Sequence, residues 1–217
     1  MKQTIKVKAL TDWKDVTLKK YLELMADIDA YKDDQEAVDA LMLHHLCGIP
    51  YDEIQNVSTE SYKILKSKLS QFLKPEDMDL QRFITIDGVE YGFEPNLSQM
   101  SYGAYADISQ YDTVSIDKNW AKIMSILYRP VTKKDKHGLY TIQQYDGKID
   151  EKMWLEVTMD FHFGTLFFFL NLQMDLMKDT LKSLTQKEFH PNINTILEES
   201  GEAIQQYTNL QKGTLKE

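Results

Sequence analysis

The chain has 217 residues, of which 42% are hydrophobic and 27% charged, the usual balance of a folded globular protein. Its single cysteine excludes an intramolecular disulfide, and its net charge of −9 argues against a general nucleic-acid-binding protein. No apolar run approaches the ~20 residues of a membrane span, and the first eight residues lack the apolar stretch of a signal peptide. We therefore expect a protein of a reducing compartment without direct contact to membranes or nucleic acids.

Residues 1–78 are predicted to form an N-terminal three-helix unit. Thr17 can cap the first helix, whose apolar residues recur at the spacing of one helix face. Gly48 lies where the second helix should end in a positive φ, and Pro50 prevents its continuation. The helices are expected over 18–30, over 35–46 and from Ser58 or Thr59 to Lys74, with a helical turn over 51–54.

Residues 79–188 are predicted to form a second, α+β part. Two β-prone runs, 83–86 and 89–93, flank Asp87-Gly88, which is a strong signal for a tight hairpin turn. The alternation over 139–145 favours a third short strand. Helices are expected over 102–111, over 118–128 with a stop at Pro130, and over 150–184 with a possible break near Gly164, whereas 132–138 is expected to be a loop. The predicted fold is therefore α+β and mostly α-helical.

Residues 189–217 are expected to form a peripheral helix or a mobile tail. Their apolar residues are sparse, and Glu and Gln are frequent.

Candidate metal ligands are His44, His45 and Cys47. Neighbouring residues on a helix point about 100° apart, and no second ligand pair accompanies them. We expect a buried cysteine and ordinary histidines, with no metal and no cofactor.

An enzyme is the alternative hypothesis, with a site near His162, Asp160 and Asp175. Positions i and i+2 of a helix do not face each other, so Asp160 is poorly placed to orient His162. Asp175 and Asp179 have the spacing of one helix face, but Lys178 and Lys182 lie beside them, as on a solvated edge. The sequence shows no Gly-rich phosphate-binding loop and no metalloprotease motif. We expect no enzymatic activity.

The stretch between Ile84 and Asp117 carries six acidic residues and one sign of charge only. A solvated surface is one interpretation, and a docking face for a basic partner is the other.

Aromatic residues provide the candidate interfaces. Tyr102 and Tyr105 share one side of a predicted helix that ends near Tyr111, and tyrosine suits half-wetted contacts. Three consecutive phenylalanines, Phe167, Phe168 and Phe169, point in three directions on a helix, so at least one should contact another part of the chain or another subunit.

Two stretches resemble small assembly and virion proteins of tailed bacteriophages, particularly those of Bacteroidetes hosts, including crAss-like phages. The turn over 48–54, Gly-Ile-Pro-Tyr-Asp-Glu-Ile, is similar to the start of phage tail assembly chaperones. The stretch over 86–107, from Ile-Asp-Gly through Tyr-Gly-Phe to Tyr-Gly-Ala-Tyr-Ala-Asp, is similar to their second part. The resemblance spans about residues 15–185 and concerns turns and caps rather than catalytic residues.

The resemblance implies a non-enzymatic phage protein that works through protein–protein contacts. It would be a tail assembly chaperone, or a virion subunit of the tail, the head–tail neck or the interior. Its partners would be other phage proteins in a homo- or hetero-oligomer, in the virion or in the cytoplasm of the infected bacterium. A host cytosolic adaptor is a further alternative.

Overall fold

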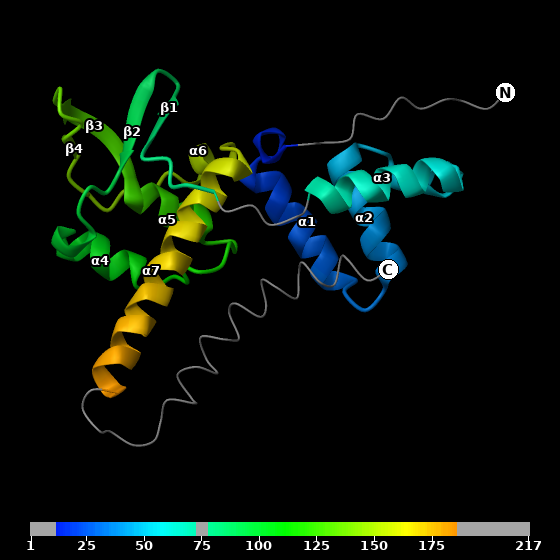
Figure 1. Cartoon of the computed structure of the whole chain (residues 1–217). Coiled ribbons are helices and arrows are strands. Elements are labelled where there is room, and N and C mark those ends of the chain that lie inside the picture. The colour runs from blue at the N-terminus through cyan, green and yellow to red at the C-terminus, as the bar shows by residue number, and fades with distance from the viewer. Residues whose placement is uncertain (1–11, 73–77, 186–217) are drawn as a thin grey trace. The chain divides into compact units, whose positions relative to one another are not determined.

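A computed structural model describes residues 12–72 and 78–185, and the chain divides into two compact units (Figure 1). In the described part, the first unit holds residues 12–72 and 158–160, and the second holds 78–157 and 161–185. The units divide after Glu76, whereas the sequence predicts a boundary after residue 78. The predicted tail, 189–217, lies outside the described residues. Helices and one antiparallel sheet confirm the mostly helical α+β class.

The described first unit consists of helices that begin and end where caps favour it. Thr17 accepts a hydrogen bond from the Lys20 N–H at the start of the first helix, and Gly48 adopts a left-handed φ of 66° after the second, as predicted. The elements are η1 (Trp13–Asp15), α1 (Leu18–Ala30), α2 (Gln35–Cys47), η2 (Tyr51–Asn56) and α3 (Thr59–Phe72).

Helix α2 supplies most of the core of this unit. Its side chains are buried on more than one face: Val38, Leu41, Met42, Leu43 and Leu46. Leu24 of α1 and Leu69 of α3 are also buried. A helix that is apolar over most of its surface is stable in water only when it is covered, which makes α2 the centre of the first unit.

The second unit contains a four-stranded antiparallel sheet in the order β1-β2-β3-β4. The predicted hairpin is confirmed, because Asp87 (φ 50°) and Gly88 (φ 80°) form the turn between the first two strands. The strands are β1 (Phe83–Ile86), β2 (Val89–Phe93), β3 (Tyr128–Lys134) and β4 (Tyr140–Ile142).

Strand β3 was not predicted. A helix that stops at Pro130 and a loop over 132–138 are the sequence-based expectations, but helix α5 (Trp120–Leu127) continues directly into β3. Pro130 has no N–H to donate, but its carbonyl accepts the Gln143 N–H at 2.8 Å. The predicted third strand, expected to pair with the hairpin or lie close to it, is therefore β4: it pairs with β3 and lies close to the hairpin, because the Tyr140 hydroxyl donates to the Phe93 carbonyl at 2.7 Å.

Two predicted helices differ from the observed ones. The 102–111 helix is α4 (Tyr102–Ile108), which leaves Tyr111 outside it. The 150–184 helix is divided into α6 (Glu151–Leu155) and α7 (Met159–Thr185), so the break lies at 156–158 and not at Gly164. Gly164 instead permits a close backbone approach, because a Cβ there would lie 2.5 Å from the Asp79 carbonyl oxygen.

The core of the second unit joins α5 to aromatic residues of the sheet and of α7. Trp120, Ile123 and Met124 of α5 are fully buried. The Tyr128 ring lies 5.3 Å from that of Trp154 and 4.9 Å from that of Phe161, measured between centroids. These contacts fix the enclosed end of α7, whereas its far end extends beyond the sheet and α5 (Figure 1).

Candidate interaction surfaces

Helix α4 presents two exposed tyrosines from a well-anchored backbone. Ser101 caps the helix by accepting the Ala104 N–H, and Ala104 is fully buried beneath it. Tyr102 is 84% exposed and Tyr105 is 62% exposed. These two residues form the α4 tyrosine face.

The C-terminal half of α4 is held by a hydrogen bond from another element. The Tyr145 hydroxyl donates to the Asp107 carboxylate, and the Arg129 guanidinium lies 5.9 Å from the centre of the Tyr145 ring. Burial, together with the bond to Asp107, raises the pKa of Tyr145 above its ordinary value, so the phenol remains a donor at neutral pH. The helix that carries the α4 tyrosine face is thus held in place at both ends.

Tyr111 does not belong to this face. It follows the end of α4, its side chain is half-buried, and the Lys122 ammonium lies 5.7 Å from the centre of its ring. The structure therefore brings together two of the three tyrosines that the sequence analysis grouped.

The three phenylalanines of α7 are all half-buried. The Phe168 ring lies 5.3 Å from that of Phe93 in β2, so Phe168 faces the sheet. Phe167 contacts Phe163, one turn earlier, and Phe169 contacts Phe168. Beyond them, Leu172, Met174 and Leu176 are exposed, which the sequence analysis missed although the apolar run visibly continues past Phe169.

His162 is a buried structural residue of the second unit. Its Nδ1 accepts a hydrogen bond from the Trp120 indole, and its Nε2 lies 3.2 Å from the Trp154 carbonyl oxygen, to which it donates. The ring is fully buried, so this pattern requires the neutral form with its proton on Nε2.

The structure does not assemble the hypothetical enzyme site. Asp175 is exposed and pairs with Lys178 at 3.2 Å. It follows His162 by thirteen residues on one continuous helix, a separation of about 20 Å. Asp160 accepts a hydrogen bond from the Thr158 hydroxyl at 2.6 Å.

His44, His45 and Cys47 point to different partners. His44 Nδ1 lies 2.8 Å from the Ile49 carbonyl, and His45 Nε2 lies 2.7 Å from the Asp27 carboxylate. Cys47 is buried, and burial raises the pKa of its thiol. Among residues 12–72 and 78–185, no three His, Cys, Asp or Glu side chains form a group that would hold a metal ion.

Most of the acidic residues between Ile84 and Asp117 serve the fold. Glu94 forms an ion pair with Arg129, and both side chains are about nine-tenths buried. Four more have partners: Glu90 pairs with Lys134, Asp107 accepts from Tyr145, Asp112 accepts from Val114 and Ser115, and Asp117 accepts from Asn119. Among the described residues, only Glu94 and Glu90 of this set form ion pairs, so the other four carboxylates keep their negative charge.

A small pocket lies between α2 and α3 in the first unit. Its volume of about 20 Å³ fits little more than a water molecule. The lining residues are Asp39, Met42, Leu43, Tyr62, Lys66, Leu69 and Ser70.

Comparison of the chain with protein-family models, curated proteins and solved structures finds no match. Within the described ranges, no helix is both long and apolar enough to cross a membrane.

Proposed function

We propose that this chain is a non-enzymatic bacteriophage assembly or structural protein that acts through protein–protein contacts. The observation that carries the proposal is the α4 tyrosine face, where two aromatic side chains stand 84% and 62% exposed on an anchored helix. The partner is another phage structural or tail protein, in the virion or in the cytoplasm of the infected bacterium.

The physical properties of this face favour a protein partner. Tyrosine combines a large apolar ring with a hydroxyl that remains satisfied at a wet rim, and it is enriched at energetically important interface positions. Because α4 is fixed by Ser101, Ala104 and the Tyr145–Asp107 bond, little backbone entropy is lost on binding. An exposed pair of this kind favours recognition over catalysis.

The phage context is supported by the resemblance of the residues over 48–54 and 86–107. In the structure these residues form a left-handed helix end at Gly48, the Asp87-Gly88 turn and the α4 helix. The α4 tyrosine face is part of the second stretch, so the residues that carry the resemblance include those that we assign to the contact.

Mass spectrometry of purified phage particles beside an infected-cell lysate tests the proposal. Stoichiometric presence in particles identifies a virion subunit. Presence in the lysate alone, in complex with a tail protein, identifies an assembly chaperone. A chain found in neither particles nor complexes with phage proteins would contradict the phage function.

The α4 tyrosine face is tested by a Tyr102→Ala/Tyr105→Ala variant in the phage genome. Truncation of an interface hot spot costs about 2 kcal/mol or more, which is roughly a thirtyfold loss of affinity. We expect a matching loss of infectious particles while the purified variant stays folded. The matched control is Tyr31→Ala/Tyr51→Ala, which removes two tyrosines that are each 54% exposed in the first unit. Equal yields from the two variants would exclude α4 as the contact.

A further inference from the structure

Strand β1 is an outer strand of the sheet, and one of its two edges pairs with no other strand among the described residues (Figure 1). On its other edge it pairs with β2 in an antiparallel ladder, in which successive residues direct their N–H and C=O groups to opposite edges. The Arg82 carbonyl accepts the Phe93 N–H at 2.9 Å, which fixes the phase of this alternation. The backbone groups of Phe83 and Thr85 therefore point to the free edge.

The two outer edges of the sheet differ in their protection against a further strand. At the opposite edge, β4 has only three residues, and its register with β3 shifts between Val131 and Lys133. A very short edge strand and an irregular ladder both discourage further pairing. β1 instead forms a regular ladder of four residues, Phe-Ile-Thr-Ile, without a charge or a proline. β1 is therefore the edge that can accept another strand.

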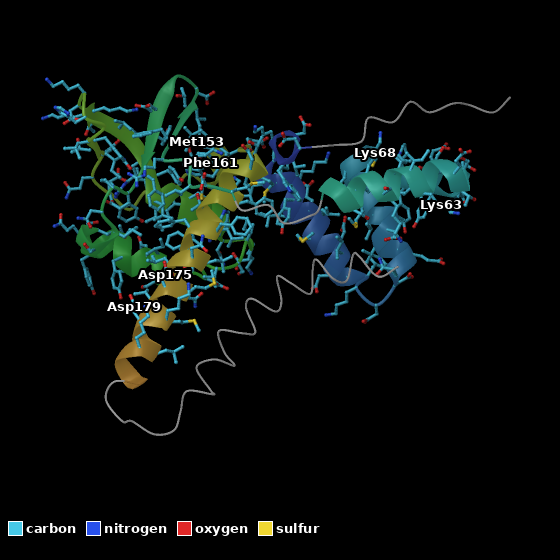
Figure 2. The ribbon with its side chains drawn as sticks, in the orientation of Figure 1. Lys63, Lys68, Met153, Phe161, Asp175 and Asp179 are labelled. Atoms are coloured by element: carbon cyan, nitrogen blue, oxygen red, sulfur yellow. The ribbon has the colours of Figure 1, made fainter. Side chains whose placement is uncertain are left out.

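The apolar side chains of the β1–β2 hairpin are incompletely covered within the second unit. The core contacts of the sheet lie at the end of α7 that carries Phe161, whose ring is 4.9 Å from that of Tyr128 in β3 (Figure 2). Toward the hairpin turn, Ile84 and Ile86 are only half-buried, and Val89 is 43% exposed. A strand added beside β1 would cover more of Ile84 and Ile86, because cross-strand neighbours contact each other on the same face.

We propose that a second copy of this chain adds its own β1 to this edge, with the two strands antiparallel about a twofold axis at Ile84. In that register Phe83 lies opposite Thr85 of the second copy, and the two residues exchange two hydrogen bonds. The twofold axis repeats this pair, so four hydrogen bonds satisfy every outward N–H and C=O of both strands. A shift of the register in either direction leaves half of these groups unmatched. This inference concerns self-association and does not depend on the proposed function.

Charge selects a second copy as the occupant and sets its direction. Arg82 precedes β1 and Asp87 follows it, so the strand carries opposite charges at its two ends, both on exposed residues. Within the described ranges, neither residue forms an ion pair. Antiparallel pairing places Arg82 of each copy opposite Ile86 of the other, one residue from Asp87, whereas parallel pairing would set like charges side by side. The strand is therefore complementary to a copy of itself.

Sedimentation velocity of the full chain, from low micromolar to near-millimolar concentration, tests this inference. We expect a concentration-dependent shift from monomer to dimer. Thr85→Pro removes an outward N–H and leaves the pairing with β2 intact, so it should weaken dimerisation at least tenfold. The matched control is Thr85→Val, which keeps both the N–H and a β-branched side chain and should leave dimerisation unchanged. Tyr102→Ala/Tyr105→Ala should also leave it unchanged, which separates this edge from the α4 tyrosine face.

Two results of the sedimentation experiment would overturn the inference. One is a natural chain that stays monomeric at every concentration, which would mean that a second copy is not the occupant of the β1 edge. The other is a dimer that persists undiminished in Thr85→Pro, which would place the contact elsewhere.

Charge reversal tests the antiparallel register through two exposed residues. Arg82→Glu and Asp87→Lys should each dimerise several-fold more weakly than the natural chain, because like charges then meet twice across the two strands. An equimolar mixture of the two variants should recover the dimer, because each end of the mixed pair again joins opposite charges. A mixture that dimerises as weakly as the separate variants would contradict this register.

Cysteine cross-linking tests the position of the twofold axis. In a Cys47→Ala background, Ile84→Cys should form a disulfide between two copies, because residue 84 lies opposite itself in a non-hydrogen-bonded pair with Cα atoms about 4.5 Å apart. Thr85→Cys in the same background is the control, since its two copies would lie about 8 Å apart, too far for a disulfide. Equal cross-linking of the two variants would contradict an axis at Ile84.

Discussion

The indole Nε1–H of Trp120 donates a hydrogen bond to Nδ1 of His162 at 3.2 Å, and both side chains are fully buried. The other nitrogen of the imidazole meets the Trp154 carbonyl at 3.2 Å. His162 of α7 therefore links Trp120 of α5 to Trp154 of α6. Its role in the described structure is to satisfy polar groups inside an apolar core.

Replacing His162 should destabilise the second unit. His162→Phe leaves the Trp120 indole donor buried without its acceptor, which costs about 1–3 kcal/mol. Urea unfolding measures the loss, and His137→Phe in the exposed turn after β3 is the control, for which we expect almost no change. A double-mutant cycle with Trp120→Phe should show coupling, and additive effects would contradict the importance of this bond.

The first unit should lose stability in acid through Asp39. Burial alone would raise the pKa of this carboxyl, but hydrogen bonds from Lys66, Tyr62 and Gln35 outweigh burial and hold its pKa below the ordinary value. Because the folded-state pKa is the lower one, the stabilisation is present above the unfolded value of about 3.9 and is lost as pH falls through the folded value. Asp39→Asn should flatten this acid dependence in unfolding titrations, and exposed Asp33→Asn should not.

Tyr62 should produce the opposite dependence at alkaline pH. Burial and the hydrogen bond to Asp39 raise the pKa of Tyr62 to about 12. The resulting stabilisation is present below the unfolded pKa of about 10 and is lost as pH rises toward 12. Tyr62→Phe should remove this alkaline loss when unfolding is measured against pH, and an unchanged alkaline limb would contradict the assignment.

The same substitution should have opposite effects at two helical glycines. Gly164→Ala places a Cβ 2.5 Å from the Asp79 carbonyl oxygen, so the backbone must shift and the unit is destabilised. Gly103→Ala meets only the Tyr145 ring at 3.7 Å, an ordinary contact, and should stabilise α4 by about 0.5–1 kcal/mol. Thermal unfolding compares the two variants, and a Gly164→Ala chain as stable as the natural one would refute the close approach at Gly164.

The Glu94–Arg129 pair should be more costly to break than to remove. Glu94→Gln leaves a buried guanidinium without its counter-charge, which costs about 3–5 kcal/mol. Replacing both residues, as in Glu94→Gln/Arg129→Met, should recover much of that loss in chemical denaturation. A double variant as unstable as Glu94→Gln alone would show that the pair is required for more than mutual neutralisation.

Local signals predicted the elements that depend on local chemistry. Thr17, Gly48 and the Asp87-Gly88 turn lie where the caps and the hairpin were expected, because each favours its conformation through its own backbone and side chain. Strand β3 was missed because Pro130 and the following lysines resemble a helix stop and a loop. Its strand conformation comes instead from pairing with β2 and β4.

Contacts between residues far apart in the chain could not be predicted from local sequence patterns. The break before α7 is not marked by glycine, and the reason for Gly164 is the Asp79 backbone 85 residues earlier. For the surfaces, helical spacing grouped Tyr102 with Tyr105, but the early end of α4 separates Tyr111 from them. The exposure of Leu172, Met174 and Leu176 depends on where the rest of the second unit ends. The spacing of apolar residues along the chain does not predict that.

The three tryptophans of the chain are distributed unevenly between the two units. Trp13 lies in the first unit and is half-buried, whereas Trp120 and Trp154 lie in the second and are fully buried. Intrinsic fluorescence of a Trp13→Phe chain therefore reports only on the second unit, and its difference from the natural chain reports on the first. The molecule thus contains its own optical probes for whether the two units unfold together or one after the other.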